Sequence, residues 1–142
     1  MAYQAKRTKK FIEDFQLVEE NGNVYKTLHI QLDADDMLAK INRKYTALCK
    51  ALTETTEMKR KSQSAEELDD CIETLGNAVI QLFEAVFGEE DAKTIVEFYD
   101  NRYIEMCQEV VPFIRNVVIP RINKIKKENR KATLSPYRNR RR

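Results

Sequence analysis

A tight turn near the amino terminus is the feature that most constrains how this chain can fold. Asn21-Gly22 separates two runs rich in apolar and aromatic side chains, residues 11–18 and 24–32. Asn-Gly between such runs is the strongest short-range sign of a β-hairpin, because both residues tolerate the left-handed backbone of a two-residue turn. Such a turn sets Glu20 opposite Asn23. The sequence therefore predicts two antiparallel strands at the start of the chain.

The register that follows from this turn sorts the side chains onto two faces. Phe15 pairs with Leu28 on an apolar face, and Asp14 pairs with His29 on the opposite face. Two charged residues are exceptions to the sorting: Glu13 and Lys26. An enzyme would need His29, the only histidine, as a base or metal ligand. We expect instead an exposed imidazole beside a carboxylate.

Apolar residues that recur every three or four positions predict helices after the hairpin. The predicted segments span about residues 34–58, 64–88, 89–99 and 103–127. Asp33 precedes the first helix, and its side chain can cap free backbone amides. Ser64 and Glu67 form a capping box at the start of the second, and Gly88 can end it with a left-handed backbone. Asp100-Asn101 is expected to break the third helix.

The fourth helical segment contains Pro112 and Pro120. A proline removes a backbone donor and crowds the preceding turn, so this segment should kink or divide. The predicted fold class is α+β and mostly α, with an N-terminal β-hairpin followed by about four helices, the last kinked by prolines.

Charge divides the chain of 142 residues, which is long enough for one domain, into three parts. Residues 1–10 carry +4, residues 11–120 carry −11, and residues 121–142 carry +9. We expect a basic N-terminal arm (1–10), a single α+β domain (11–131) and a basic, disordered tail (132–142), because the tail holds too few apolar side chains to order itself.

The residue types of the chain argue against catalysis, a cofactor and a metal site. The three glycines are far apart and form no phosphate-binding loop. A calcium loop starting at Asp33 would need glycine at its sixth position and glutamate at its twelfth, where Leu38 and Lys44 stand. Cys49, Cys71 and Cys107 are too widely spaced for the usual zinc ligand sets. We expect a protein that is not an enzyme and has no cofactor.

Two further features bear on location. No apolar run is long enough to span a membrane, and the first residues lack the apolar stretch of a secretory signal. The odd number of separated cysteines is typical of free thiols in a reducing compartment. The sequence therefore predicts a cytoplasmic protein without a membrane segment.

Two stretches carry a resemblance to a known family: Val79-Ile80-Gln81-Leu82-Phe83-Glu84-Ala85-Val86-Phe87-Gly88-Glu89-Glu90-Asp91-Ala92-Lys93 and Tyr103-Ile104-Glu105-Met106-Cys107-Gln108-Glu109. They are similar to tail assembly chaperones of long-tailed phages and prophages of Gram-positive bacteria. In that family an aromatic-rich helix ends in Phe-Gly, and a short helix with acidic residues at its start follows. The resemblance covers roughly residues 24 to 119. The basic tail and the polar insert near Lys59 depart from the family pattern.

The resemblance implies a protein that coats the phage tape measure protein, keeps it soluble and helps to recruit tail tube subunits. The candidate contact residues for this partner are the aromatic residues Phe83, Phe87, Phe98 and Tyr99. The alternative for such a stripe is packing in the core. A homo-oligomer is also expected, because a two-stranded hairpin offers two unpaired edges.

Two other functions stay open at this stage. A phage structural connector or tail-completion protein would share the helical build. A nonspecific nucleic-acid-binding accessory protein would contact phosphates through the tail arginines Arg138, Arg140, Arg141 and Arg142. The tail holds a single aromatic residue and no recognition fold, so such binding would not read sequence.

Overall fold

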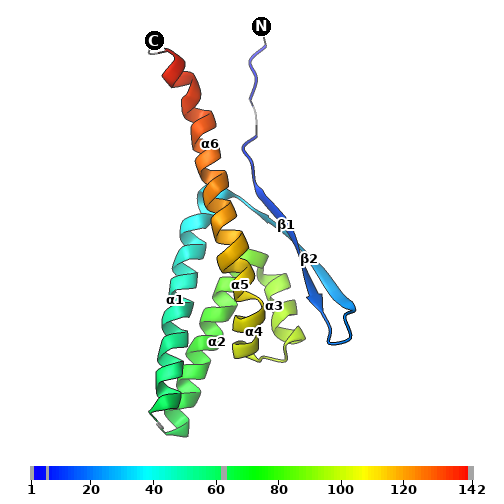
Figure 1. Ribbon diagram of the computed structural model, residues 1–142, viewed down its shortest axis with the longest axis vertical. Helices are drawn as coiled ribbons and strands as arrows, with labels where there is room; N and C mark the ends of the chain where they lie inside the picture. Colours follow the sequence, from blue (N-terminus) through cyan, green and yellow to red (C-terminus); the bar gives the residue numbers. More distant parts are fainter. Residues whose placement is uncertain (1, 6, 62–63, 141–142) are drawn as a thin grey trace.

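The structure is a computed structural model that describes residues 2–5, 7–61 and 64–140, with the backbone alone for 132–140. Its elements are β1 (Phe11–Val18), β2 (Val24–Leu32), α1 (Ala34–Arg60), α2 (Ala65–Phe87), α3 (Glu89–Phe98), α4 (Tyr103–Glu109), α5 (Val111–Phe113), the π-helical turn η1 (Ile114–Val118) and α6 (Ile119–Arg140). The predicted α+β fold is confirmed, with α4 to α6 forming the bent last helix (Figure 1). The helices α1 and α2 form a long antiparallel pair, and the hairpin lies across the helices on the other side of the molecule (Figure 1).

The predicted strand pairing is confirmed for residues 11–17 of β1, but the predicted two-residue turn is wrong. The Glu19 N–H donates to the Asn23 carbonyl and the Gly22 N–H to the Glu19 carbonyl, both at 2.9 Å. Three residues therefore form the loop, and Gly22 takes the positive φ of 88° that this loop needs. Asn-Gly suits either loop, so the dipeptide alone does not select the shorter one.

A β-bulge compensates for the longer loop. Val18 pairs with Val24, whereas Leu17 already pairs with Lys26, so Tyr25 is an extra residue on β2. Beyond the bulge the register is the predicted one, with Phe15 opposite Leu28. The hairpin consequently turns its apolar face to the helices although its turn differs from the expected type.

The inner face of the hairpin closes the hydrophobic core. Five of its side chains are buried: Phe11, Leu17, Leu28, Ile30 and Leu32. Glu13, an exception in the predicted sorting, also lies on this face and forms an ion pair with Arg121 of α6. The guanidinium of Arg121 stacks 5.1 Å from the ring centroid of Phe11. A charged residue is thus accommodated on this face by a partner that bridges the sheet and the last helix.

Side-chain caps start the two long helices as predicted. An Asp33 carboxylate oxygen accepts from the Asp35 N–H at 3.0 Å, and the Ser64 hydroxyl accepts from the Glu67 N–H at 3.3 Å. Helix α2 supplies much of the core with residues spaced by three or four: Leu75, Val79, Leu82 and Val86. Its Gly76 lies directly beneath the ring of Tyr103, where a Cβ atom would come within 2.5 Å. That glycine allows α4 to start against α2.

Two breaks define the corner between α2 and α4. Gly88, with φ 88°, ends α2 and starts α3, as predicted. Asp100 and Asn101 end α3 with φ values of 52° and 61°. Positive φ is uncommon outside glycine, and Asp and Asn are among the residues that tolerate it best. The chain therefore reverses sharply here and brings the start of α4 beside the end of α3.

The last helix bends at both prolines. The chain turns at Val110, two residues before Pro112, and η1 ends at Val118, so that Pro120 is the second residue of α6. Pro120 has no N–H for the carbonyl four residues earlier and would press its ring against that group. The π-helical turn η1 is wider than an α-helical turn: the Ile119 N–H donates to the Ile114 carbonyl, one residue farther back than in an α-helix. The predicted kink is confirmed in this form.

The described residues of the N-terminal arm and the C-terminal part of α6 lie at the same end of the molecule (Figure 1). The Asn129 side chain of α6 accepts from the Lys9 N–H and donates to the Lys9 carbonyl, both at 3.1 Å. The Lys9 ammonium pairs with Glu128 at 3.1 Å. The basic arm is therefore attached to α6 at Lys9, and this end of the protein combines the positive charge of the arm and of the described part of α6.

The expectation of a disordered tail (132–142) stays a prediction. Helix α6 runs to Arg140, while the side chains of 132–140 and the whole of Arg141 and Arg142 lie outside the described residues. In the described part of the chain, no helix is both long enough and apolar enough to cross a membrane.

Candidate protein-binding groove

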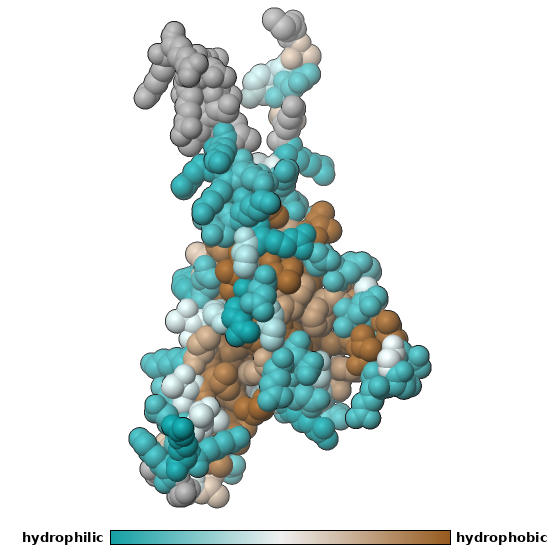
Figure 2. Space-filling view, in the orientation of Figure 1, coloured by the Kyte–Doolittle hydropathy of each residue, from teal (hydrophilic) through white to brown (hydrophobic). Residues whose placement is uncertain are grey.

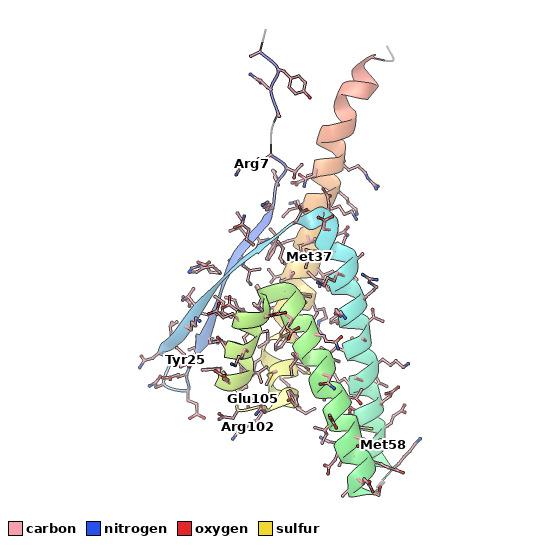
Figure 3. All side chains as sticks on the ribbon, turned by 180° about the vertical axis from the view of Figure 1, so that it is seen from behind. Arg7, Tyr25, Met37, Met58, Arg102 and Glu105 are labelled. Carbon is pink, nitrogen blue, oxygen red and sulfur yellow. The ribbon has the colours of Figure 1, made fainter. Side chains whose placement is uncertain are left out.

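A groove of about 580 Å³ lies between the hairpin turn and the corner of α3 and α4. Three segments that are far apart in the sequence line it: the end of β1 with the turn, the end of α3, and α4. The lining residues are Val18, Glu19, Glu20, Asn21, Phe98, Tyr99, Asp100, Arg102, Glu105 and Glu109. Figure 3 shows Tyr25 beside the hairpin turn and Arg102 with Glu105 on the neighbouring end of α4.

The apolar part of the groove is aromatic. Phe98 and Tyr99 meet edge to face with their ring centroids 4.9 Å apart, and Tyr25 approaches Phe98 at 5.1 Å. The bulge on β2 makes Tyr25 the extra residue, next to α3. Val18, Val24 and Tyr25 are 47%, 50% and 55% exposed. Figure 2 shows apolar surface towards this end of the hairpin, whereas the end with α6 and the arm is hydrophilic.

Carboxylates form the rim. Glu19 and Glu20 come from the turn, Asp100 from the end of α3, and Glu105 and Glu109 from one side of α4, against the single cation Arg102. Arg102 contacts Glu105 at 3.7 Å, and the other four carboxylates have no salt bridge to any of the described residues. The groove therefore carries an excess of four negative charges around an aromatic floor.

The pKa of Tyr99 reflects this environment. Burial raises the pKa of its phenol, and the negative charges of Glu109 and Glu105 raise it further. The phenol is therefore held neutral and can donate a hydrogen bond. The groove as a whole suits a partner segment that presents apolar or aromatic side chains together with cations.

The four predicted contact residues divide into two pairs. Phe83 and Phe87 lie in the core, at 0% and 8% exposure, and pack in an aromatic cluster with Phe15 and Phe113. Large apolar residues on the inner stripe of a central helix fill the core, so Phe83 and Phe87 cannot reach a partner in the folded protein. Phe98 and Tyr99 are half-buried and line the groove, so they remain the candidate contacts.

The other candidate groups have varied positions. The side chains of the predicted phosphate contacts, Arg138, Arg140, Arg141 and Arg142, lie outside the described residues. His29 is exposed, with its Nδ1 atom 2.6 Å from Asp14, as the register predicted. The three cysteines are free thiols. Among the described residues, no group of three or more His, Cys, Asp or Glu side chains is placed to hold a metal ion.

Sequence reasoning missed the acidic rim and the role of Tyr25. The rim joins residues separated by about 80 positions, and their meeting depends on the chain reversal after α3. A partial signal exists, because Glu105 and Glu109 are four residues apart and therefore share one side of α4. No local signal marks the bulge that places Tyr25.

The sequence matches no family model, and neither a curated protein nor a solved structure matches the chain.

Proposed function

We propose that this protein is a phage or prophage tail assembly chaperone that binds the tape measure protein and keeps it soluble before the tail tube forms. It acts by binding, without catalysis, in the cytoplasm of the bacterial host. In the same complex it helps to recruit tail tube subunits. The motifs at residues 79–93 and 103–109 carry the family resemblance behind this proposal.

The observation that carries the proposal is the groove at the hairpin turn with its aromatic floor. A tape measure protein is a very long helix, and before its tube is assembled its apolar side chains face water. Val18, Tyr25 and Phe98 offer an apolar surface at the groove, and covering such surface contributes about 25 cal/mol per Å². If many copies bind along one tape measure protein, their weak individual contacts together give a stable complex.

Co-expression with the tape measure protein of the same phage tests the proposal. The wild-type chain should keep that protein soluble and co-purify with it. Val18→Asp combined with Tyr25→Asp should abolish co-purification: Val18 lines the groove, the Tyr25 ring contacts the lining residue Phe98, both side chains are about half exposed, and a carboxylate there opposes burial. Ile12→Asp is the matched control, since Ile12 is 64% exposed at the other end of the hairpin and should bind as the wild type does.

Two results would contradict the proposal. One is a tape measure protein that stays soluble without this chain and never co-purifies with it. The other is this chain at fixed stoichiometry in purified mature virions, which would favour the connector or tail-completion function instead.

A further inference from the structure

The groove and the C-terminal tail have complementary charge. The groove at the hairpin turn has an excess of four negative charges over an aromatic floor. The last residues of the chain, 137–142, read Tyr-Arg-Asn-Arg-Arg-Arg and contain four cations and no acid. Arginine is the side chain best suited to both parts of the groove, because its guanidinium binds carboxylates with paired hydrogen bonds and stacks on aromatic rings.

The tail cannot reach the groove of its own chain. Helix α6 has 22 residues, which corresponds to about 33 Å of helix. It leads away from the body, and its C-terminal end lies far from the hairpin turn (Figure 1). The Asn129 contact with Lys9 also holds α6 in this direction. Any partner for the groove with this chemistry must therefore come from another molecule.

We propose that residues 137–142 of one copy bind in the groove of a second copy. The arginines pair with the rim carboxylates that lack a salt bridge among the described residues, namely Glu19, Glu20, Asp100 and Glu109. The Tyr25 and Phe98 rings provide the stacking surface. The contact joins two different surfaces, so each copy donates one tail and offers one groove. Copies can therefore add head to tail.

This self-association uses the same groove as the proposed chaperone function. Its role in the cell rests on that proposed function. A tape measure segment and the tail of a second copy would then compete, and the groove is covered until the partner is made. The contact itself needs no tape measure protein. Experiments on the purified chain therefore test it separately from the proposed function.

Light scattering after size-exclusion chromatography across a concentration series is the first test. The molar mass of the nuclease-treated wild type should increase with concentration from the 16.7 kDa of one chain towards larger multiples, and this increase should be smaller at high salt. A groove variant, Glu20→Lys with Glu109→Lys, and a tail variant, Arg138→Glu with Arg140→Glu, should each remain at 16.7 kDa. Glu57→Lys with Glu73→Lys makes the same charge change at exposed sites on α1 and α2 and should associate as the wild type does.

Mixing the two defective variants gives the sharper test. The groove variant still has an intact tail and the tail variant an intact groove, so the mixture should form a dimer of twice 16.7 kDa and stop there. Combining all four substitutions in one chain leaves both the groove and the tail without net charge, so this variant should also remain at 16.7 kDa. Circular dichroism establishes that each variant is folded.

Three results would overturn the inference. The mixture could stay monomeric, or the single variants could associate as well as the wild type. Alternatively, nuclease treatment could abolish the association, which would assign the tail to nucleic acid. Loss of co-purification with the tape measure protein while the mixed dimer still forms would instead contradict only the proposed function.

Discussion

The close contact between Gly76 and Tyr103 leads to a prediction about stability. Whether Gly76→Ala destabilises or stabilises the protein should depend on the residue at position 103. Gly76 is buried in the middle of α2, and a Cβ atom there would lie 2.5, 2.7 and 2.9 Å from three atoms of the Tyr103 ring. Unstrained contacts between carbon atoms are about 3.5–4.0 Å. The Gly76→Ala variant must therefore push the ring by about 1 Å, and α4 begins at this tyrosine.

Two opposing effects set the size of the change. Alanine is favoured over glycine in a helix by about 0.8–1 kcal/mol. Overpacking of a well-filled site costs about 1–3 kcal/mol. We expect steric strain in the upper part of this range, about 2–3 kcal/mol, because all three contacts involve one ring that is partly buried against the core. Gly76→Ala should therefore destabilise the protein by about 1–2 kcal/mol.

Urea denaturation followed by circular dichroism measures this change. With a slope of about 1–3 kcal/mol per M, the midpoint should fall by roughly 0.5–1 M. In a Tyr103→Ala background the ring is absent, so the same Gly76→Ala substitution should stabilise the protein by about 1 kcal/mol. The coupling energy between the two sites is then about 2–3 kcal/mol. Equal effects of Gly76→Ala in both backgrounds would refute the reasoning.

Three further predictions concern other contacts. Asn129→Ala removes both hydrogen bonds to Lys9, so amide exchange at Lys9 should accelerate about tenfold in hydrogen-exchange measurements, whereas unchanged exchange would contradict the contact. The hydrogen bond from Arg121 lowers the pKa of Glu13 below 4.5. The ionised Glu13 therefore stabilises the fold above pH 4.5, and this stabilisation is lost as the pH falls through the lowered pKa. Denaturation at several pH values should show that the difference in stability between the wild type and Glu13→Gln disappears on acidification, and a constant difference would contradict the ion pair. Burial raises the pKa of Cys107 to about 11, so a variant retaining only this cysteine should react with a thiol reagent at pH 8 about 100-fold more slowly when folded than in urea.

Local signals predicted the elements, and tertiary contacts decided their details. Asn21-Gly22 located the hairpin, and the capping residues Asp33 and Ser64 marked the helix starts. The three-residue loop and the Tyr25 bulge were not predictable, since each compensates for the other in the final register. Pro120 predicted a bend, whereas the π-helical form depends on how α6 packs beside α1 and β1.

The groove illustrates the limit for the candidate site. The sequence indicated aromatic residues as contacts but could not separate Phe83 from Phe98, because both follow helical spacing. Burial separates them, and burial depends on which side of each helix meets the hairpin and α2. The acidic rim forms only when the turn at Asp100 and Asn101 sets α4 beside the hairpin turn.

The wide turn η1 makes the direction of the last helix depend on residue count. Five fully buried residues, Met106, Val110, Ile114, Val118 and Ile122, follow one another at steps of four. In a straight α-helix each such step overshoots a full turn by about 40°, and the stripe would wind away from the core. Deleting one residue within 114–118 would turn η1 into an ordinary α-helical turn and leave the helix after it in place, because η1 already absorbs one extra residue. Deleting Asn123 instead, where α6 has α-helical geometry, would rotate everything after it by about 100°. Asn129 would then point away from Lys9, so a single deletion would separate the two basic ends without removing any of their charges.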